Sequence, residues 1–166
     1  RKLYDNIVSY LSSLFSSGSM TEEQATQTAG MMYILSDIER ADALCTEATE
    51  SLQSILEKKH KLSPEAVEDL CRGLQIIEDM YQNVLEVIRT GNGEDARKIV
   101  HKKDNVLDLT LKLRKNHMKR VKQGACDAEM TSDFTRILHS FDRIGNSCAN
   151  IADAALTGVS FESVLK

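Results

Sequence analysis

Two stretches of the chain combine acidic residues with apolar residues at the spacing of a helix. They are SDIERADALC (36–45) and SFDRIGNSCANIAD (140–153). Acids in such a setting can bind a metal ion, contact a partner, or line the solvent-exposed side of a helix. The other residues of the chain, and the elements that carry these stretches, bear on which of the three uses applies.

Few other residues have the spacing that catalysis needs. The sequence contains no P-loop and no nucleophile elbow, and no serine, histidine and aspartate that can be argued to form a triad. His139, one turn before Asp142, is the histidine placed to add a metal ligand. We expect His60, His101 and His117 to be surface residues. We therefore predict that the chain is not an enzyme.

The composition favours a helical domain in a reducing compartment. The 166 residues include one proline and no tryptophan. A formal net charge of −4 gives no reason to expect nucleic acid as a partner. Residues 97–122 are locally basic, which suits either a solvated helix face or a surface for an anion or a membrane. The four cysteines lack a C-x-x-C spacing, and we expect three of them in the core.

Apolar periodicity and capping signals predict five long helices. Thr21 and Gln24 form a capping box, Ser63 is a good N-cap, and Gly91 or Asn92 can end a helix in the left-handed conformation. Short connections make consecutive long helices antiparallel, so we predict an all-α, up-down bundle without strands. The expected helices span about 3–16, 21–59, 63–90, 94–122 and 127–156.

The second expected helix carries an apolar seam that should face the bundle. The seam consists of Leu35, Ile38, Cys45, Ala48, Leu52 and Ile55. Projected on this helix, Asp42 lies near the seam, between Ile38 and Cys45. A carboxylate there is costly unless it is paired or coordinated. We expect it to reach the edge of the seam, to meet an arginine, or to bind a cation.

The second acidic stretch resembles the signature helix of the PhoU family, which reads roughly Leu-Glu-Arg-Ile-Gly-Asp-His-Ala-x-Asn-Ile-Ala-Glu. The matching positions are Asp142, Arg143, Ile144, Gly145, Asn146, Ala149, Asn150, Ile151, Ala152 and Asp153. The stretch YILSDIERADALCTEATE (33–50) is similar to the same helix of a preceding repeat, with Asp37, Glu39 and Arg40 in place. The family's unit is a three-helix bundle that ends in this helix.

The resemblance divides the chain into two parts packed as one domain. Residues 1–62 would be the last two helices of a first unit, and residues 63–166 a complete three-helix unit. Such domains occur as phosphate-signalling regulators and as the cytoplasmic C-terminal region of bacterial sodium/phosphate cotransporters. Because the chain lacks an initial Met and begins within a unit, the second kind is implied. We then expect a transporter domain before Arg1, a place at the inner face of the membrane, and self-association.

The resemblance also implies metal ligands, because the family's signature carboxylates can bind iron or zinc. The corresponding residues are Glu39, Asp42, Asp142 and Asn146. The neutral Asn146 and the altered spacing of Asp42 imply one or a few weakly held ions rather than a full cluster. In the alternative interpretation these residues form polar ridges beside the apolar stripes and pair with arginines such as Arg40 and Arg143.

Together, the residues and the resemblance favour a regulatory domain that modulates phosphate uptake through protein contacts, with or without metal. A helical interaction or scaffold domain with no role in metal or phosphate binding is the alternative. A metal-dependent enzyme in a helical bundle is a third interpretation, which tightly bound iron together with turnover of a substrate would support.

Overall fold

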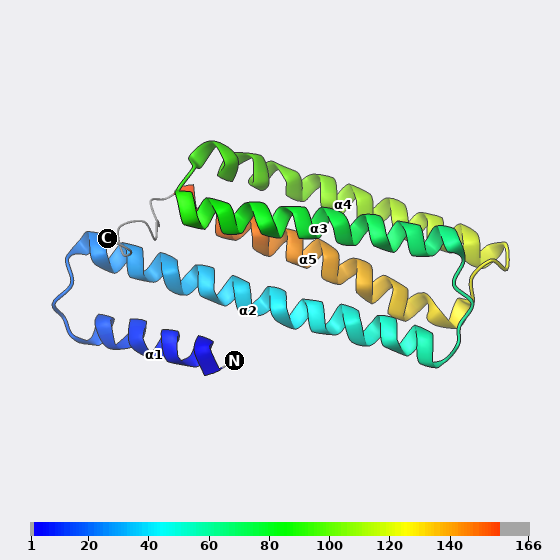
Figure 1. Ribbon diagram of the computed structural model, residues 1–166, viewed down its shortest axis with the longest axis horizontal. Coiled ribbons are helices and arrows are strands. Elements are labelled where there is room, and N and C mark those ends of the chain that lie inside the picture. The colour runs from blue at the N-terminus through cyan, green and yellow to red at the C-terminus, as the bar shows by residue number, and fades with distance from the viewer. Residues whose placement is uncertain (1, 157–166) are drawn as a thin grey trace.

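The computed structural model describes residues 2–156, and in that range five α-helices form an antiparallel bundle without a strand (Figure 1). This confirms the predicted all-α, up-down architecture. Residue 1 and residues 157–166, the end of the second predicted unit, lie outside the described residues. The elements are α1 (Lys2–Ser16), α2 (Glu22–Glu57), α3 (Pro64–Thr90), α4 (Gly93–Lys122), a 3₁₀ turn η1 (Ala128–Met130) and α5 (Thr131–Leu156).

The helix ends follow the capping residues of the sequence. The Thr21 hydroxyl accepts a hydrogen bond from the backbone amide of Gln24 at 3.2 Å. In return, the Gln24 side-chain oxygen accepts one from the backbone amide of Thr21 at 2.9 Å. Ser63 caps α3 in front of Pro64. Gly91 ends α3 with a φ of 68°, a conformation that costs glycine little. These caps confirm the predicted boundaries to within a few residues.

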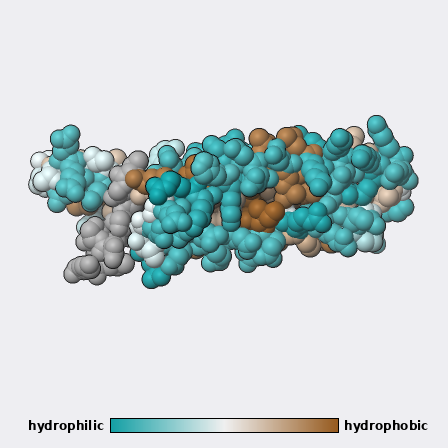
Figure 2. Space-filling view, turned by 90° about the horizontal axis from the view of Figure 1, so that it is seen from above, coloured by the Kyte–Doolittle hydropathy of each residue, from teal (hydrophilic) through white to brown (hydrophobic). Residues whose placement is uncertain are grey.

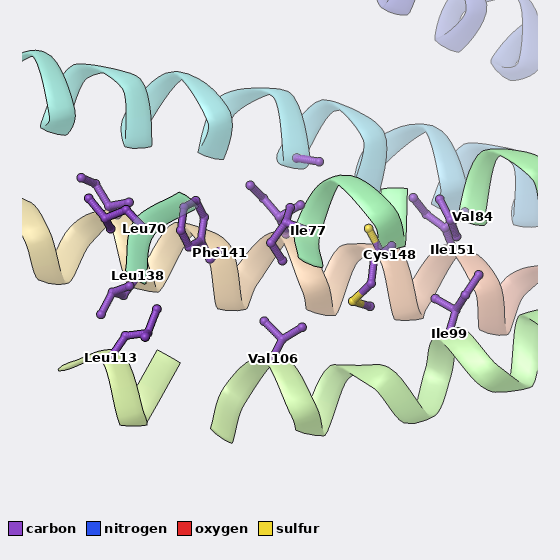
Figure 3. Packing of buried hydrophobic residues seen from close by; sticks show 14 of the residues in the cluster. Leu70, Ile77, Val84, Ile99, Val106, Leu113, Leu138, Phe141, Cys148 and Ile151 are labelled. Carbon is purple, nitrogen blue, oxygen red and sulfur yellow. The ribbon is translucent and has the colours of Figure 1, made fainter. Parts of the chain in front are cut away.

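The core forms where α5 packs against α2, α3 and α4. Side chains seven residues apart on each helix interdigitate there, as in a coiled coil (Figure 3). Two glycines allow close helix packing: a Cβ on Gly145 would lie 3.2 Å from Val106, and one on Gly73 would lie 2.7 Å from the ring of Phe141. The interdigitating residues include Leu70, Ile77, Val84, Ile99, Val106, Leu113, Phe141, Cys148 and Ile151.

The face of α2 that packs on α5 is not the predicted seam. Of the seam residues Ile55 is buried, whereas Cys45 and Leu52 are exposed. The face that α2 buries contains Ile34, Asp37, Ala41, Ser51 and Ile55. The apolar residues of α2 are spread around the helix because it packs on α5 and also on α1, so its sequence contains no single stripe.

Two further predictions about burial were wrong. Only Cys126 and Cys148 are buried, whereas Cys45 and Cys71 are exposed. His117 is not a surface residue, because none of its surface is exposed. Its ring stacks on Phe134 with 4.1 Å between the ring centroids, and its Nε2 lies 3.2 Å from the hydroxyl of Thr131.

α1 is the most weakly attached helix of the bundle. It lies along α2 on the side away from α4 (Figure 1), and Leu11 is its one buried residue. Leu3 and Tyr10 of the same helix are 72% and 63% exposed. Within the part of the chain that the structure describes, every helix is too short or too polar to cross a membrane.

Candidate functional site

A polar strip runs along the exposed side of α5, the helix that otherwise supplies the centre of the core. Steps of three or four residues keep its members on one helical face, while Ile137, Ile144 and Ile151 hold the opposite side of α5 in the core. The packing of α5 therefore fixes the strip as a rigid surface. The polar strip consists of Arg136, His139, Arg143, Asn146, Asn150 and Asp153.

The first acidic stretch contributes a buried carboxylate beside this strip. Asp37 of α2 is 3% exposed. The side-chain amide of Asn150 donates a long hydrogen bond of 3.5 Å to its Oδ1, and Arg40 Nη1 lies 3.8 Å from the same oxygen. These contacts offset part of the cost of burying the charge. The two signature-like stretches therefore meet at Asp37 and Asn150.

The buried acid of α2 is Asp37, whereas Asp42 is exposed and lies beside Ile38 and Cys45, on a face that α2 does not bury. Asp42 is exposed because Ala41 and Asp37 occupy the face that α2 turns to α5. The sequence contained a signal for this arrangement. Asp37 lies three residues after Ile34 and four before Ala41, so these three residues share one helical face.

Glu39 and Asp42 line a groove that α1, α2 and α3 form. Partial burial, and then a hydrogen bond and charge repulsion from the Glu39 carboxylate, raise the pKa of Tyr4 in α1. Glu39 itself is half-buried. The groove and the polar strip lie on different sides of α2, because Arg40 and Asp37 face the strip while Glu39 and Asp42 face the groove.

Asp142 and Asn146 are half-buried on α5, one turn apart, and neither lines the groove. The side-chain amide of Asn146 donates a hydrogen bond to the backbone carbonyl of Asp142 at 2.9 Å, which leaves the amide oxygen free to be a ligand for a cation.

The four predicted ligands thus divide between two places. Within residues 2–156, no three His, Cys, Asp or Glu side chains gather where they could hold a metal ion. The donor set does not fit a shared cluster, and binding of iron or zinc stays a prediction.

The thiol of Cys148 is buried in the core, on the side of α5 away from the polar strip. Burial raises the pKa of Cys148 to about 12, and the nearby Cys45 and Asp37 add to the rise. A thiol that stays protonated at neutral pH is a poor nucleophile and a poor metal ligand. The chemistry that the strip offers is therefore hydrogen bonding and ion pairing through its arginines, amides and carboxylate.

Comparison with known protein families gives a match to the PhoU domain over residues 70–155. The matched range contains most of α3, all of α4 and nearly all of α5, including every residue of the polar strip. No curated protein matches the chain.

Proposed function

Because the chain belongs to the PhoU family, we propose that it is the cytoplasmic regulatory domain of a sodium/phosphate cotransporter. Membership in this regulatory, non-enzymatic family supports a regulatory role in phosphate transport. The match covers residues 70–155, the three-helix part of the chain that carries the polar strip, and it supports the regulatory role. The assignment to a cotransporter goes beyond this match and is our proposal. The transporter part would precede Arg1 and place this domain at the inner face of the membrane.

The polar strip is the surface that we propose for contact with the transporter. His139 and Arg143 are exposed in its middle, on a helix whose other side is locked in the core. Arginine forms paired hydrogen bonds with carboxylates, and a rigid surface loses little conformational entropy on binding. Asp37 and Asn150 hold the neighbouring α2 in register with the strip. A partner would therefore meet both signature-like helices at once.

Regulation would follow from differential binding. If the strip binds one conformation of the transporter more tightly than another, docking shifts the transporter toward that conformation. A tenfold difference in affinity corresponds to about 1.4 kcal/mol, which is enough to change flux measurably. No covalent step is needed, in agreement with the regulatory character of the family.

The proposal is tested by phosphate uptake in cells that express the full-length protein. Removing residues 1–166 should leave the transporter in the membrane and change the dependence of uptake on external phosphate. A photo-reactive amino acid at position 143 should crosslink to the transporter, whereas one at Glu129, an exposed residue of η1, should not. Unchanged uptake together with no crosslink to a transporter would contradict the proposal.

The predicted metal is tested separately by elemental analysis of protein purified without chelator or an affinity metal. We propose that any ion is weakly held, because each pair of donors offers only two side chains. Iron or zinc at about one ion per chain or more, lost in Glu39→Ala/Asp142→Ala, would support the ligand assignment. Equal metal in the variant and the wild type would contradict it.

A further inference from the structure

A groove between α2 and α3 lies apart from the polar strip. It has a volume of about 1040 Å³, and α1 forms one of its walls. Its lining is mostly apolar, with Ile38, Ile77 and Ile144 from three different helices. Leu3 and Leu74 at the groove remain 72% and 55% exposed, so apolar surface is left open to water there.

The charged groups that line this groove all have the same sign. Glu39, Asp42 and Glu78 line it, and no lysine, arginine or histidine is among its lining residues. Asp42 and Glu78 are exposed. An apolar groove with an acidic border fits a helix whose apolar stripe is flanked by basic residues, because both the apolar and the charged surfaces then find partners.

α4 presents such a stripe on the surface of the same molecule. Leu107, Leu111 and Met118 are 44%, 51% and 42% exposed, and steps of four and seven residues place them on one side of the helix. Lys103 lies four residues before Leu107, and Arg114 three residues after Leu111, so exposed cations lie along the stripe. On the face that α3 and α4 form, apolar side chains gather near the middle of an otherwise hydrophilic surface (Figure 2).

We propose that the groove of one copy binds the α4 stripe of a second copy. None of the groove's lining residues belongs to α4, so the two surfaces are separate and the contact is head-to-tail. A contact of this kind closes into a ring or continues as a chain of copies, unlike a two-fold dimer. The α4 helix would enter the groove with its leucines on the apolar floor and with Lys103 and Arg114 opposite Asp42 and Glu78.

The test is a charge swap, followed by sedimentation velocity at several concentrations of the protein containing residues 1–166. Asp42→Lys/Glu78→Lys reverses the groove, and Lys103→Glu/Arg114→Glu reverses the stripe. Each variant alone should associate at least about tenfold more weakly than the wild type, because like charges then face each other. An equal mixture of the two should regain the association of the wild type, because every contact again joins opposite charges.

The matched control for Asp42→Lys/Glu78→Lys is Glu57→Lys/Glu129→Lys, which makes the same change of net charge at two exposed positions outside the groove. It should associate as the wild type does, and circular dichroism should show that all variants are folded. A wild type that stays monomeric, or a mixture no more associated than its parts, would overturn the proposal. If the monomer instead bound phosphatidylglycerol vesicles, and the stripe variant did not, α4 would face a membrane and the proposal would be wrong.

Discussion

The α3–α5 part of the bundle and the α1–α2 part bury their helices to different extents. α5 contacts three helices and has buried residues from Asp133 to Ala152. α1 packs mainly on α2 and buries only Leu11. An amphipathic helix needs neighbours over its whole apolar face, and α1 does not have them. The α3–α5 part is therefore the more firmly packed scaffold, and the open groove lies beside the weakly attached α1.

The two signature-like helices show the same contrast at the level of single residues. In α5, Ile144 and Gly145 are buried and the polar residues lie together on the strip. In α2, Asp37 is buried while Glu39 and Asp42 face the groove. Similar local sequences thus have different surroundings, because α5 lies between neighbours and α2 lies at an edge.

The largest expected difference between the two parts comes from burying a charge in each. Ile144→Asp places an unpaired carboxylate at a 3% exposed position and should lower the free energy of unfolding by at least about 3 kcal/mol. Leu11→Asp should release α1 and leave the other helices folded. Urea unfolding followed by circular dichroism, with limited proteolysis of α1, measures both. Equal loss of stability in the two variants would contradict the distinction between scaffold and edge.

Next in size is the ion pair that joins α3 to α4. Arg120 Nη1 lies 2.8 Å from Asp69 Oδ2, and both side chains are almost buried. Asp69→Ala leaves the Arg120 charge without this partner and should destabilise the fold by about 2–4 kcal/mol. Glu86→Ala, which removes an exposed pair with Arg89, should cost much less stability, because solvent screens this pair. Denaturant midpoints of both variants test this, and similar values would be a failure of the prediction.

A smaller effect should separate two glycines of the same unit. In Gly73→Ala the added methyl group would lie 2.7 Å from the buried ring of Phe141, so we expect a loss of about 1–2 kcal/mol despite the better helix propensity of alanine. In Gly93→Ala the added methyl group would lie 3.5 Å from Leu156 Cδ2, an ordinary contact, so stability should be unchanged or slightly higher. Thermal unfolding compares the two, and a stabilised Gly73→Ala protein would contradict the close packing.

The smallest expected effect concerns pH. Burial, and then the charge of Arg120, lower the pKa of His117 below its usual range near 6.5. Because the unfolded chain binds this proton more readily, the stabilising contribution of neutral His117 is present above about pH 6.5 and is lost as the pH falls below it. His117→Gln should reduce the loss of stability between neutral and mildly acidic pH, whereas His101→Gln, at an exposed position, should not. An unchanged pH dependence in His117→Gln would count against the burial of a neutral ring.

The sequence predicts the helices better than the faces they turn inward. Caps such as Thr21 and Ser63 act through backbone amides a few residues away, so local sequence is enough to place them. Which side of α2 faces α5 depends on residues far along the chain, and its apolar residues point in several directions. A sequence signal for the burial of His117 existed, because it lies four residues after the apolar Leu113. Whether the four predicted ligands meet depends on tertiary packing, which spacing along each helix does not determine.

Phosphate uptake in cells that carry point variants of the polar strip tests the proposed function most directly. Arg40→Ala/Arg143→Ala removes two exposed cations, one beside the strip and one in it, and the matched control Arg72→Ala/Arg97→Ala removes two exposed cations elsewhere. We expect the first pair to change the response of uptake to external phosphate, as deletion of residues 1–166 should, and the control to leave it unchanged. Wild-type uptake in the first variant, with the protein folded and present at the normal level, would contradict it.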